Sequence, residues 1–160
     1  MLFFWRFMTI VIAALGLTMT SAHVLEMPQK MAYSPEMYTA VNTSLYKYFA
    51  IIGGAYQIGG ILLAAVTTAL LRHRNATTFR WSIAGFLLLL LSFVSWLLLV
   101  QPVNREIGTA LASSPDTVAA LWMRLRDRWE YGHAVGFVFH LLGFGALVFS
   151  LVRDAERRTY

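Results

Sequence analysis

Two pairs of ionisable side chains stand out because each places a histidine three residues from a glutamate. His23 and Glu26 follow the first long apolar stretch, and Glu130 and His133 open the last one. At this spacing each pair shares one face of a helix. The two pairs lie at the same membrane depth if the two helices are antiparallel neighbours. Such a set suits proton transfer, in which a histidine takes a proton and a glutamate orients it.

The same four side chains suit two other roles. Glutamate and histidine at this spacing on facing helices build carboxylate-bridged metal sites in four-helix bundles. Alternatively the pairs are structural, and bind each other or Arg105, Arg124 or Arg128. A complete metal site needs further ligands, which the sequence does not indicate. We therefore assign no metal and no cofactor, and keep His23, Glu26, Glu130 and His133 as the alternative metal ligands.

A stripe of methionines offers a competing metal site. Met19, His23, Met27 and Met31 recur every four residues, and thioethers with imidazole suit copper. Pro28 is expected to end the helix before Met31 joins the stripe. Adaptable filling of the core is therefore the favoured role of these methionines.

The elements that must position these residues are four apolar stretches, each long enough to cross a bilayer as a helix of roughly 20 residues. Of the 160 residues, 58% are hydrophobic and 13% are charged, against about 25% charged in soluble domains. The chain has no cysteine, which excludes disulfides and thiol chemistry. We predict a single all-α membrane domain over residues 1–160, an antiparallel bundle of four transmembrane helices. Its spans cover about residues 2–22, 45–71, 81–100 and 131–152.

The first span is expected to stay in the protein. It resembles a signal peptide loosely, but four apolar residues precede Arg6 and the apolar stretch is long for such a segment. Arg6, its only charge, is expected to snorkel to the interface. Four retained spans place both termini on one side, together with the basic cluster Arg72, Arg74 and Arg80. The positive-inside rule then predicts a multi-pass protein of the cell inner membrane with both termini in the cytoplasm.

The basic residues are thus explained by topology and by lipid headgroups, so the bilayer is the expected partner and nucleic acid is not. The other side carries two long segments, 23–44 and 101–130, which contain all four prolines. Long ordered loops are usually functional, which places a localised function on this outer face. Within the second segment we predict a short amphipathic helix at the interface, leading into the fourth span. Its apolar face comprises Val118, Leu121, Trp122, Leu125 and Trp129.

A polar residue lies in the middle of the second span. Tyr46, Gly53, Gln57 and Gly60 share one helical stripe. Small residues in such a stripe mostly mean close helix packing. Gln57 is the exception, because a buried amide needs a hydrogen-bond partner. We include Gln57 among the candidate substrate-binding residues.

Three short motifs resemble the anthrone-oxygenase-like family of small four-span membrane proteins, which are largely of unknown function. The motifs are His23-Val24-Leu25-Glu26-Met27-Pro28, Pro102-Val103-Asn104 and Trp129-x-x-x-His133, and the resemblance covers roughly residues 5–150. It implies oxidation of an activated aromatic carbon by oxygen without a recognised cofactor, with histidine and tryptophan involved. By position it points to His23, Asn104, Trp129 and His133. The family pattern has an arginine where this sequence has Gly136, so Arg105 or Arg128 would have to replace it.

The leading hypothesis is therefore a relative of cofactor-independent oxygenases that binds a hydrophobic aromatic small molecule at the outer face. His23 or His133 would be the base, Glu26 or Glu130 would orient it, and Asn104 with Arg105 would bind the developing oxyanion. Arg128, Trp129 and Gln57 complete the expected substrate pocket. The alternatives are a non-catalytic membrane subunit of a larger complex or homo-oligomer, and a metal-binding membrane protein. The sequence leaves open whether the chain is an enzyme.

Overall fold

The computed structural model describes residues 1–156, apart from the side chain of Lys47, and this part of the chain is helical almost throughout. Three short helical segments lie between the α-helices: the 3₁₀ segments η1 (Leu45–Tyr48) and η3 (Pro115–Thr117), and the π segment η2 (Trp96–Val100). Residues 31–34 and 72–75 form the other two connections. The helices are α1 (Leu2–Lys30), α2 (Pro35–Ser44), α3 (Phe49–Leu71), α4 (Ala76–Ser95), α5 (Gln101–Ser113) and α6 (Val118–Glu156).

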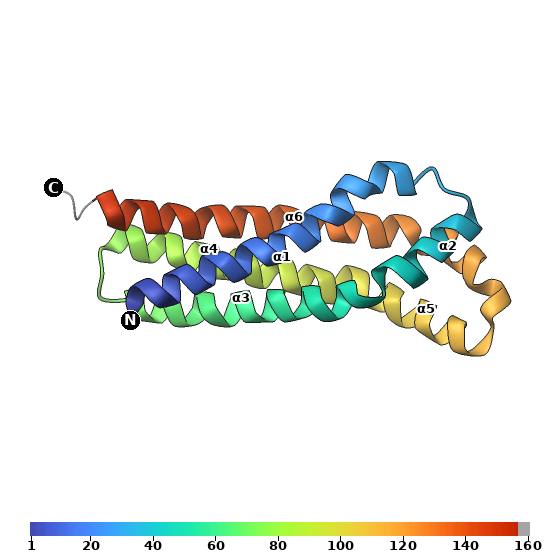
Figure 1. Ribbon diagram of the computed structural model, residues 1–160, viewed down its shortest axis with the longest axis horizontal. Coiled ribbons are helices and arrows are strands. Elements are labelled where there is room, and N and C mark those ends of the chain that lie inside the picture. The colour runs from blue at the N-terminus through green and yellow to red at the C-terminus, as the bar shows by residue number, and fades with distance from the viewer. Residues whose placement is uncertain (157–160) are drawn as a thin grey trace.

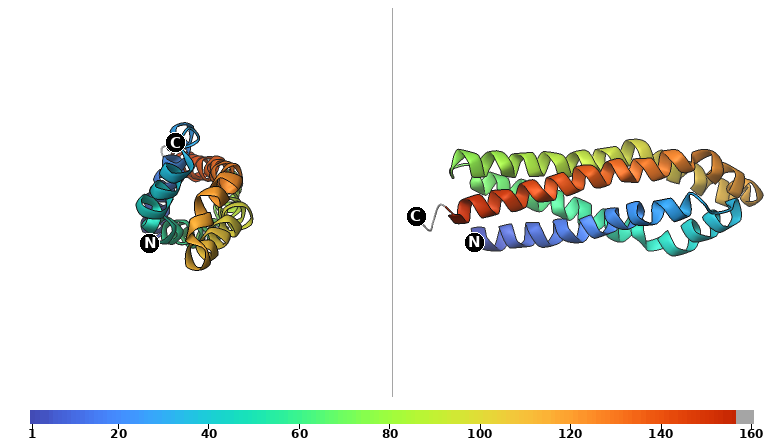
Figure 2. Two further views of the ribbon diagram at one scale, coloured as in Figure 1. Left: turned by 90° about the vertical axis from the view of Figure 1, so that its right-hand side faces the viewer. Right: turned by 90° about the horizontal axis from the view of Figure 1, so that it is seen from above.

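Four of these helices, α1, α3, α4 and α6, run side by side along the molecule (Figure 1). Contacts join α1 to α3, α3 to α4, α4 to α6 and α6 back to α1, so the four close into a ring, as the end-on view shows (Figure 2). The start of α1 and the end of α6 lie at one end, here called the proximal end; α2 and α5 lie at the opposite, distal end. The predicted all-α four-helix bundle is confirmed.

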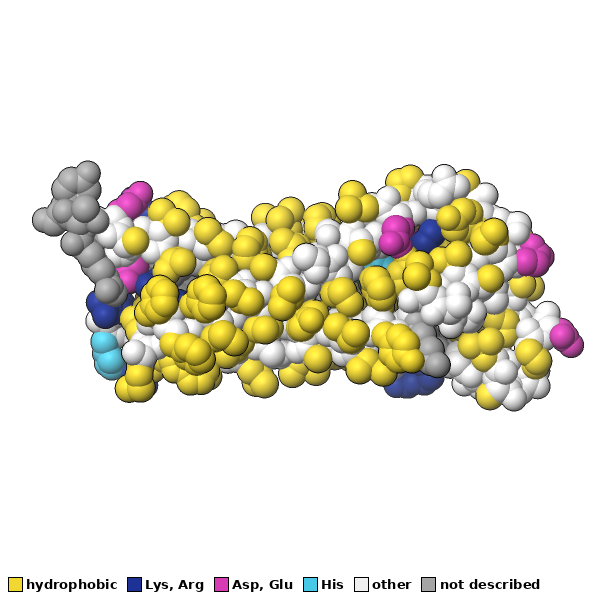
Figure 3. Space-filling view, in the orientation of Figure 1, with side chains coloured by type: hydrophobic (Ala, Val, Ile, Leu, Met, Phe, Trp, Pro, Cys, Tyr) yellow, Lys and Arg dark blue, Asp and Glu magenta, His cyan; other side chains and the backbone are white. Residues whose placement is uncertain are grey.

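The surface agrees with a membrane environment. The segments Leu2–Lys30, Phe49–Leu71, Ala76–Ser113 and Pro115–Glu156 are each long and apolar enough to cross a bilayer. Hydrophobic side chains cover the middle of the molecule, and the charged side chains in view gather toward its two ends (Figure 3). The chain is a multi-pass membrane protein whose apolar exterior faces lipid.

At the proximal end, Arg6 does not snorkel outward as predicted. Its guanidinium is buried, donates to the carboxylate of Asp154 at 2.6 Å and to the carbonyl of Ser150 at 3.0 Å. The sequence placed both charges near helix ends, and the packing of α1 on α6 brings them together. An ion pair across the bundle therefore replaces the expected contact with the interface.

At the distal end, the prolines do not end the helices. α1 continues through Pro28 to Lys30, which corrects the expected break. The third span also continues past Pro102, through η2 into α5. Pro102 has no N–H to offer the carbonyl of Leu98, four residues earlier; the Arg128 guanidinium donates to that carbonyl instead, at 3.0 Å. A side chain of α6 thus replaces the backbone hydrogen bond that proline removes.

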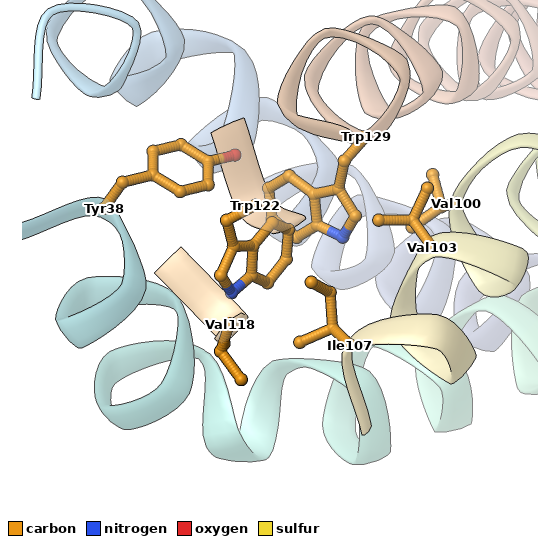
Figure 4. Close-up of a cluster of buried hydrophobic side chains, with 7 residues drawn as sticks. All are labelled: Tyr38, Val100, Val103, Ile107, Val118, Trp122 and Trp129. Atoms are coloured by element: carbon orange, nitrogen blue, oxygen red, sulfur yellow. The ribbon is translucent and has the colours of Figure 1, made fainter. Parts of the chain in front are cut away.

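The two long outer segments are therefore mostly helical and form a cap over the bundle. The amphipathic face predicted after Pro115 is present, but its helix continues without a break into the fourth span as α6. This face is buried against α2 and α5 and does not lie on a lipid interface, because those helices offer it apolar partners. The core of the cap consists of Tyr38, Val100, Val103, Ile107, Val118, Trp122 and Trp129 (Figure 4).

Candidate functional site

A cavity of about 260 Å³ lies between the bundle and the distal cap. Apolar and aromatic side chains form most of its wall, and a few polar groups interrupt it. This composition is typical of sites for small organic ligands. The lining residues are Gly16, Met19, Thr20, His23, Asn42, Tyr46, Phe49, Ala50, Gly53, Gly54, Gln57, Trp96, Gln101, Asn104, Trp122, Trp129 and His133.

Two histidines meet ring to ring in this wall. His23 of α1 stacks on His133 of α6, with 3.8 Å between ring centroids and 21° between ring planes. Tyr46 also stacks on His23, at 4.9 Å. Trp129 lies edge-on to both imidazoles, 5.1 Å from His23 and 4.4 Å from His133. The two predicted histidines are thus brought together, within an aromatic enclosure.

Asn104 fixes the tryptophan of this enclosure. The indole Nε1 of Trp129 donates to Oδ1 of Asn104 at 2.8 Å, linking α6 to α5. This bond uses Oδ1 of Asn104 as its acceptor. The Nδ2 group of the same amide is a hydrogen-bond donor, and Asn104 lines the cavity. Both residues were predicted for the site from the resemblance, and the structure joins them directly.

Several polar atoms of the cavity residues lack a partner. Among the described residues, His23 Nδ1, Asn42 Oδ1, Tyr46 Oη and Trp122 Nε1 are buried without a hydrogen bond. All four belong to residues that line the cavity. Buried polar groups are usually paired. These four unpaired atoms therefore leave residues of the cavity wall able to form hydrogen bonds with a ligand.

Glu130 is not directed to the histidines. Its Oε1 lies 2.8 Å from the Lys30 ammonium and accepts a hydrogen bond from the Tyr38 hydroxyl at 2.7 Å. Lys30 and Glu130 are only 2% and 1% exposed, so this is a fully buried ion pair. Burial and the neighbouring carboxylate raise the pKa of Tyr38 above its ordinary value, which keeps its hydroxyl a donor.

The remaining predicted site residues are divided between the cavity and the surface. Gln57 lines the cavity and its Nε2 donates to Ser92 Oγ at 3.4 Å, which supplies the partner that the sequence required. Ser92 Oγ in turn donates to the carbonyl of Gly136 at 2.8 Å. Glu26 is partly buried one turn before Lys30 and does not line the cavity.

Arg105 and Arg128, which were predicted to bind substrate, are not among the residues that line the cavity. Arg105 is exposed and borders a separate groove with Glu106, and Arg128 is exposed and bonds the Leu98 carbonyl. Successive helix positions point about 100° apart. Asn104 and Trp129 face the cavity, so their neighbours in sequence point away from it.

The described part of the chain holds no cluster of three or more histidine, aspartate or glutamate side chains that could bind a metal ion. The four residues of the alternative metal set do not converge, since Glu130 is bound by Lys30 and Tyr38. The expected pairing of glutamate with arginine does not occur at Glu130 either; a lysine takes that place.

Sequence reasoning missed the aromatic enclosure and the ion pair. Lys30 carried a usable signal, because it follows His23 by seven residues and so shares its face of α1. Tyr38 and Trp122 carried none as site residues, since their position depends on how the cap folds over the bundle. The further cavity residues not predicted for the site include Tyr46, Phe49 and Trp96.

The fold and the site together define a multi-pass membrane protein in which a four-helix bundle and its cap enclose an aromatic cavity with paired histidines. Residues 43–146 match the family described as anthrone oxygenase, and the chain belongs to that family. The matched stretch contains Gln57, Asn104, Trp129 and His133, whereas His23 precedes it. No curated protein and no solved structure matches the chain.

Proposed function

We propose that the protein oxygenates an activated aromatic carbon of a small hydrophobic molecule, without a cofactor. The observation that carries this proposal is the stacked pair His23 and His133 in the wall of a cavity whose surface is mostly apolar and aromatic. A volume of about 260 Å³ is slightly below the ~300–1,000 Å³ usual for ligand pockets. This volume suits a small molecule of a few fused rings, such as an anthrone.

The first step is removal of a proton. In an anthrone-like substrate, a carbonyl and two aromatic rings acidify a methylene group, and a neutral imidazole of the His23–His133 pair takes one of its protons. The negative charge moves onto the carbonyl oxygen, where the Nδ2 group of Asn104 donates a hydrogen bond. Trp129 supports this role, because its bond to Asn104 Oδ1 orients the amide.

The second step uses molecular oxygen as a substrate. The carbanion adds to one atom of O₂ and forms a carbon–oxygen bond, and the imidazolium returns its proton to the other atom, giving a hydroperoxide. The neutral imidazole then takes the second proton from the same carbon, the electron pair of that C–H bond forms the carbonyl, and the oxygen–oxygen bond breaks. The hydroxide released takes the proton from the imidazolium and leaves as water. The carbon becomes a carbonyl, so a methylene and O₂ yield a ketone and water. An imidazole can both take and return these protons, because it titrates near neutral pH in its ordinary state.

Oxygen uptake by the purified protein with an anthrone as substrate tests this function. His23→Ala and His133→Ala should each slow uptake at least ~100-fold, the usual scale of general-base catalysis. His73→Ala is the matched control, because His73 is exposed in the turn between α3 and α4. Equal rates for all four proteins would refute the proposal.

The proposed setting is the cell inner membrane, with the proximal end in the cytoplasm and the cavity near the outer face. The basic residues at the proximal end support this orientation: Arg72 and Arg74 lie in the turn between α3 and α4, and Arg80 lies near the start of α4. Positively charged loops favour the cytoplasmic side.

A further inference from the structure

The contact between α1 and α6 at the distal end has two adjoining parts. In the first, His23 stacks on His133. In the second, the Lys30 ammonium lies 2.8 Å from Oε1 of Glu130, with both side chains almost fully buried. Lys30 lies two turns beyond His23 on α1, and Glu130 lies one turn before His133 on α6. The ion pair and the stack therefore belong to one continuous interface.

The ammonium also contacts the rings that enclose the histidines. Lys30 Nζ lies 4.5 Å from the ring centroid of Trp129 and 4.6 Å from that of Tyr46. Both rings are in turn in contact with His23. Cation–π attraction of this kind is strongest where the cation is withdrawn from water. Trp129 and Tyr46 thus each contact both Lys30 and His23, so a shift of Lys30 would be passed to the imidazole through these two rings.

Glu130 is held from a third helix as well. The Tyr38 hydroxyl of α2 donates at 2.7 Å to the same Oε1 that meets Lys30. The carboxylate is therefore fixed from α1 by an ammonium and from α2 by a phenol. Removing one partner of such a buried pair leaves an uncompensated charge, so the arrangement is sensitive to each member.

We propose that Lys30 and Glu130 are positioning residues, which hold the two rings of the His23–His133 stack against each other and compensate each other's charge beside it. Tyr38 assists by fixing the carboxylate. This inference deepens the proposed function and rests on it for the role of the imidazoles as base.

The charges near the stack predict in which direction each substitution should change the formation of an imidazolium. On α1 the charged side chains near the stack are Lys30 and Glu26. On α6 they are Glu130 and, one turn before it and over the Tyr38 ring, Arg126. The cap and η1 contribute Tyr38 and Tyr46 as titratable groups; the cavity residues of α3, η2 and α5 are uncharged. Loss of the carboxylate leaves a positive charge that opposes formation of an imidazolium. Loss of the ammonium leaves a negative charge that favours it.

The experiment is the pH dependence of oxygen uptake in Lys30→Met, Glu130→Gln and the double variant. Activity of a base rises as pH passes its midpoint, so the midpoint should move down in Glu130→Gln and up in Lys30→Met, each by about 1 pH unit. The double variant, which has neither charge, should return close to the wild-type midpoint. Unchanged midpoints, or midpoints that move in the same direction, would overturn the inference.

A matched control comes from a second ion pair between the cap helices. Arg124 of α6 and Glu106 of α5 lie 2.7 Å apart and are exposed. Arg124→Met and Glu106→Gln should leave the pH profile of uptake unchanged. Tyr38→Phe removes one hydroxyl while it keeps both charges, and it should lower the rate with little change in the midpoint. If the midpoint moved as far in Tyr38→Phe as in Lys30→Met, the role given to the two charges would be contradicted.

A second readout does not depend on activity. The chain has no cysteine, so His23→Cys with His133→Cys introduces a single pair of thiols that a short bifunctional reagent can join. Adding Lys30→Met should slow cross-linking several-fold, and adding Arg124→Met should not. If the wild-type protein oxygenates no aromatic substrate, the proposed function fails, and cross-linking still decides the positioning role. A rate unaffected by Lys30→Met would overturn it.

Discussion

Trp129 shows how one side chain serves several parts of the site. Its ring edge meets both imidazoles, its face lies under the Lys30 ammonium, and its Nε1 holds Asn104. The last contact is the only one of these that a phenyl ring could not make at all. The separate importance of the hydrogen bond can therefore be measured by a substitution that keeps an aromatic ring.

We predict that Trp129→Phe lowers both stability and oxygen uptake. The variant loses the bond to Asn104 Oδ1 and leaves that oxygen without its present partner. Its free energy of unfolding, measured by titration with a denaturing detergent, should fall by about 1–3 kcal/mol. Trp81→Phe is the control, because Trp81 is 41% exposed near the start of α4 and does not line the cavity. A stable Trp129→Phe protein with wild-type uptake would show that the amide needs no orientation.

At the scale of the helices, the site depends on how closely α1 approaches α6. Gly16 of α1 lies against His140 of α6, whose Nε2 is bonded to the Ala13 carbonyl at 2.9 Å. A Cβ at position 16 would lie 2.7 Å from His140 Cε1 and 3.2 Å from its Nε2. The imidazole could yield only by disturbing its hydrogen bond, so the two helices would have to move apart.

Gly16→Ala should therefore destabilise the bundle by about 1–3 kcal/mol, the usual cost of overpacking. It should also slow uptake, because Gly16 lines the cavity. Gly145→Ala is the matched control in α6: nothing lies within 4 Å of its added Cβ, and alanine favours a helix over glycine by about 1 kcal/mol. The free energy of unfolding of both variants checks this. Equal stabilities would mean that the α1–α6 contact is loose.

The helices of the bundle could be predicted from the sequence, but the cap could not. Apolar runs of sufficient length define a transmembrane helix locally. Pro28 was expected to end its helix, and it does not. Pro102 also lies within a continuous helical segment, and tertiary contacts such as that of Arg128 with the Leu98 carbonyl replace the hydrogen bond that proline removes. Those contacts join residues far apart in the chain and have no local pattern.

The candidate site shows the same division. His23 and His133 could be paired from their equivalent depth in antiparallel helices, and the structure brings them together. The partner of Glu130 was missed, because Lys30 reaches it only when α1 continues past Pro28. Arg105 and Arg128 were proposed to replace the arginine that the family pattern has at the position of Gly136, and the helical phase set by Asn104 and Trp129 turns them outward.

At the scale of the whole molecule, the two ends of the bundle differ in chemistry. The proximal end is closed by a buried ion pair between Arg6 and Asp154 and by a short basic turn. The distal end carries the cap and the cavity, and several residues that line the cavity have buried polar atoms without a hydrogen-bond partner. The orientation of the protein in the membrane therefore decides from which side substrate reaches the cavity.

The proposed orientation can be tested because the chain lacks cysteine. Ser113→Cys places a thiol at the exposed end of α5 in the cap, and His73→Cys places one in the exposed turn between α3 and α4. Neither substitution removes an arginine or lysine, so the basic residues that direct topology stay in place. A membrane-impermeant maleimide applied to spheroplasts should label Ser113→Cys at once, and His73→Cys only after the membrane is permeabilised. Labelling in the opposite order would place the cavity near the cytoplasm, where the substrate would then have to be met.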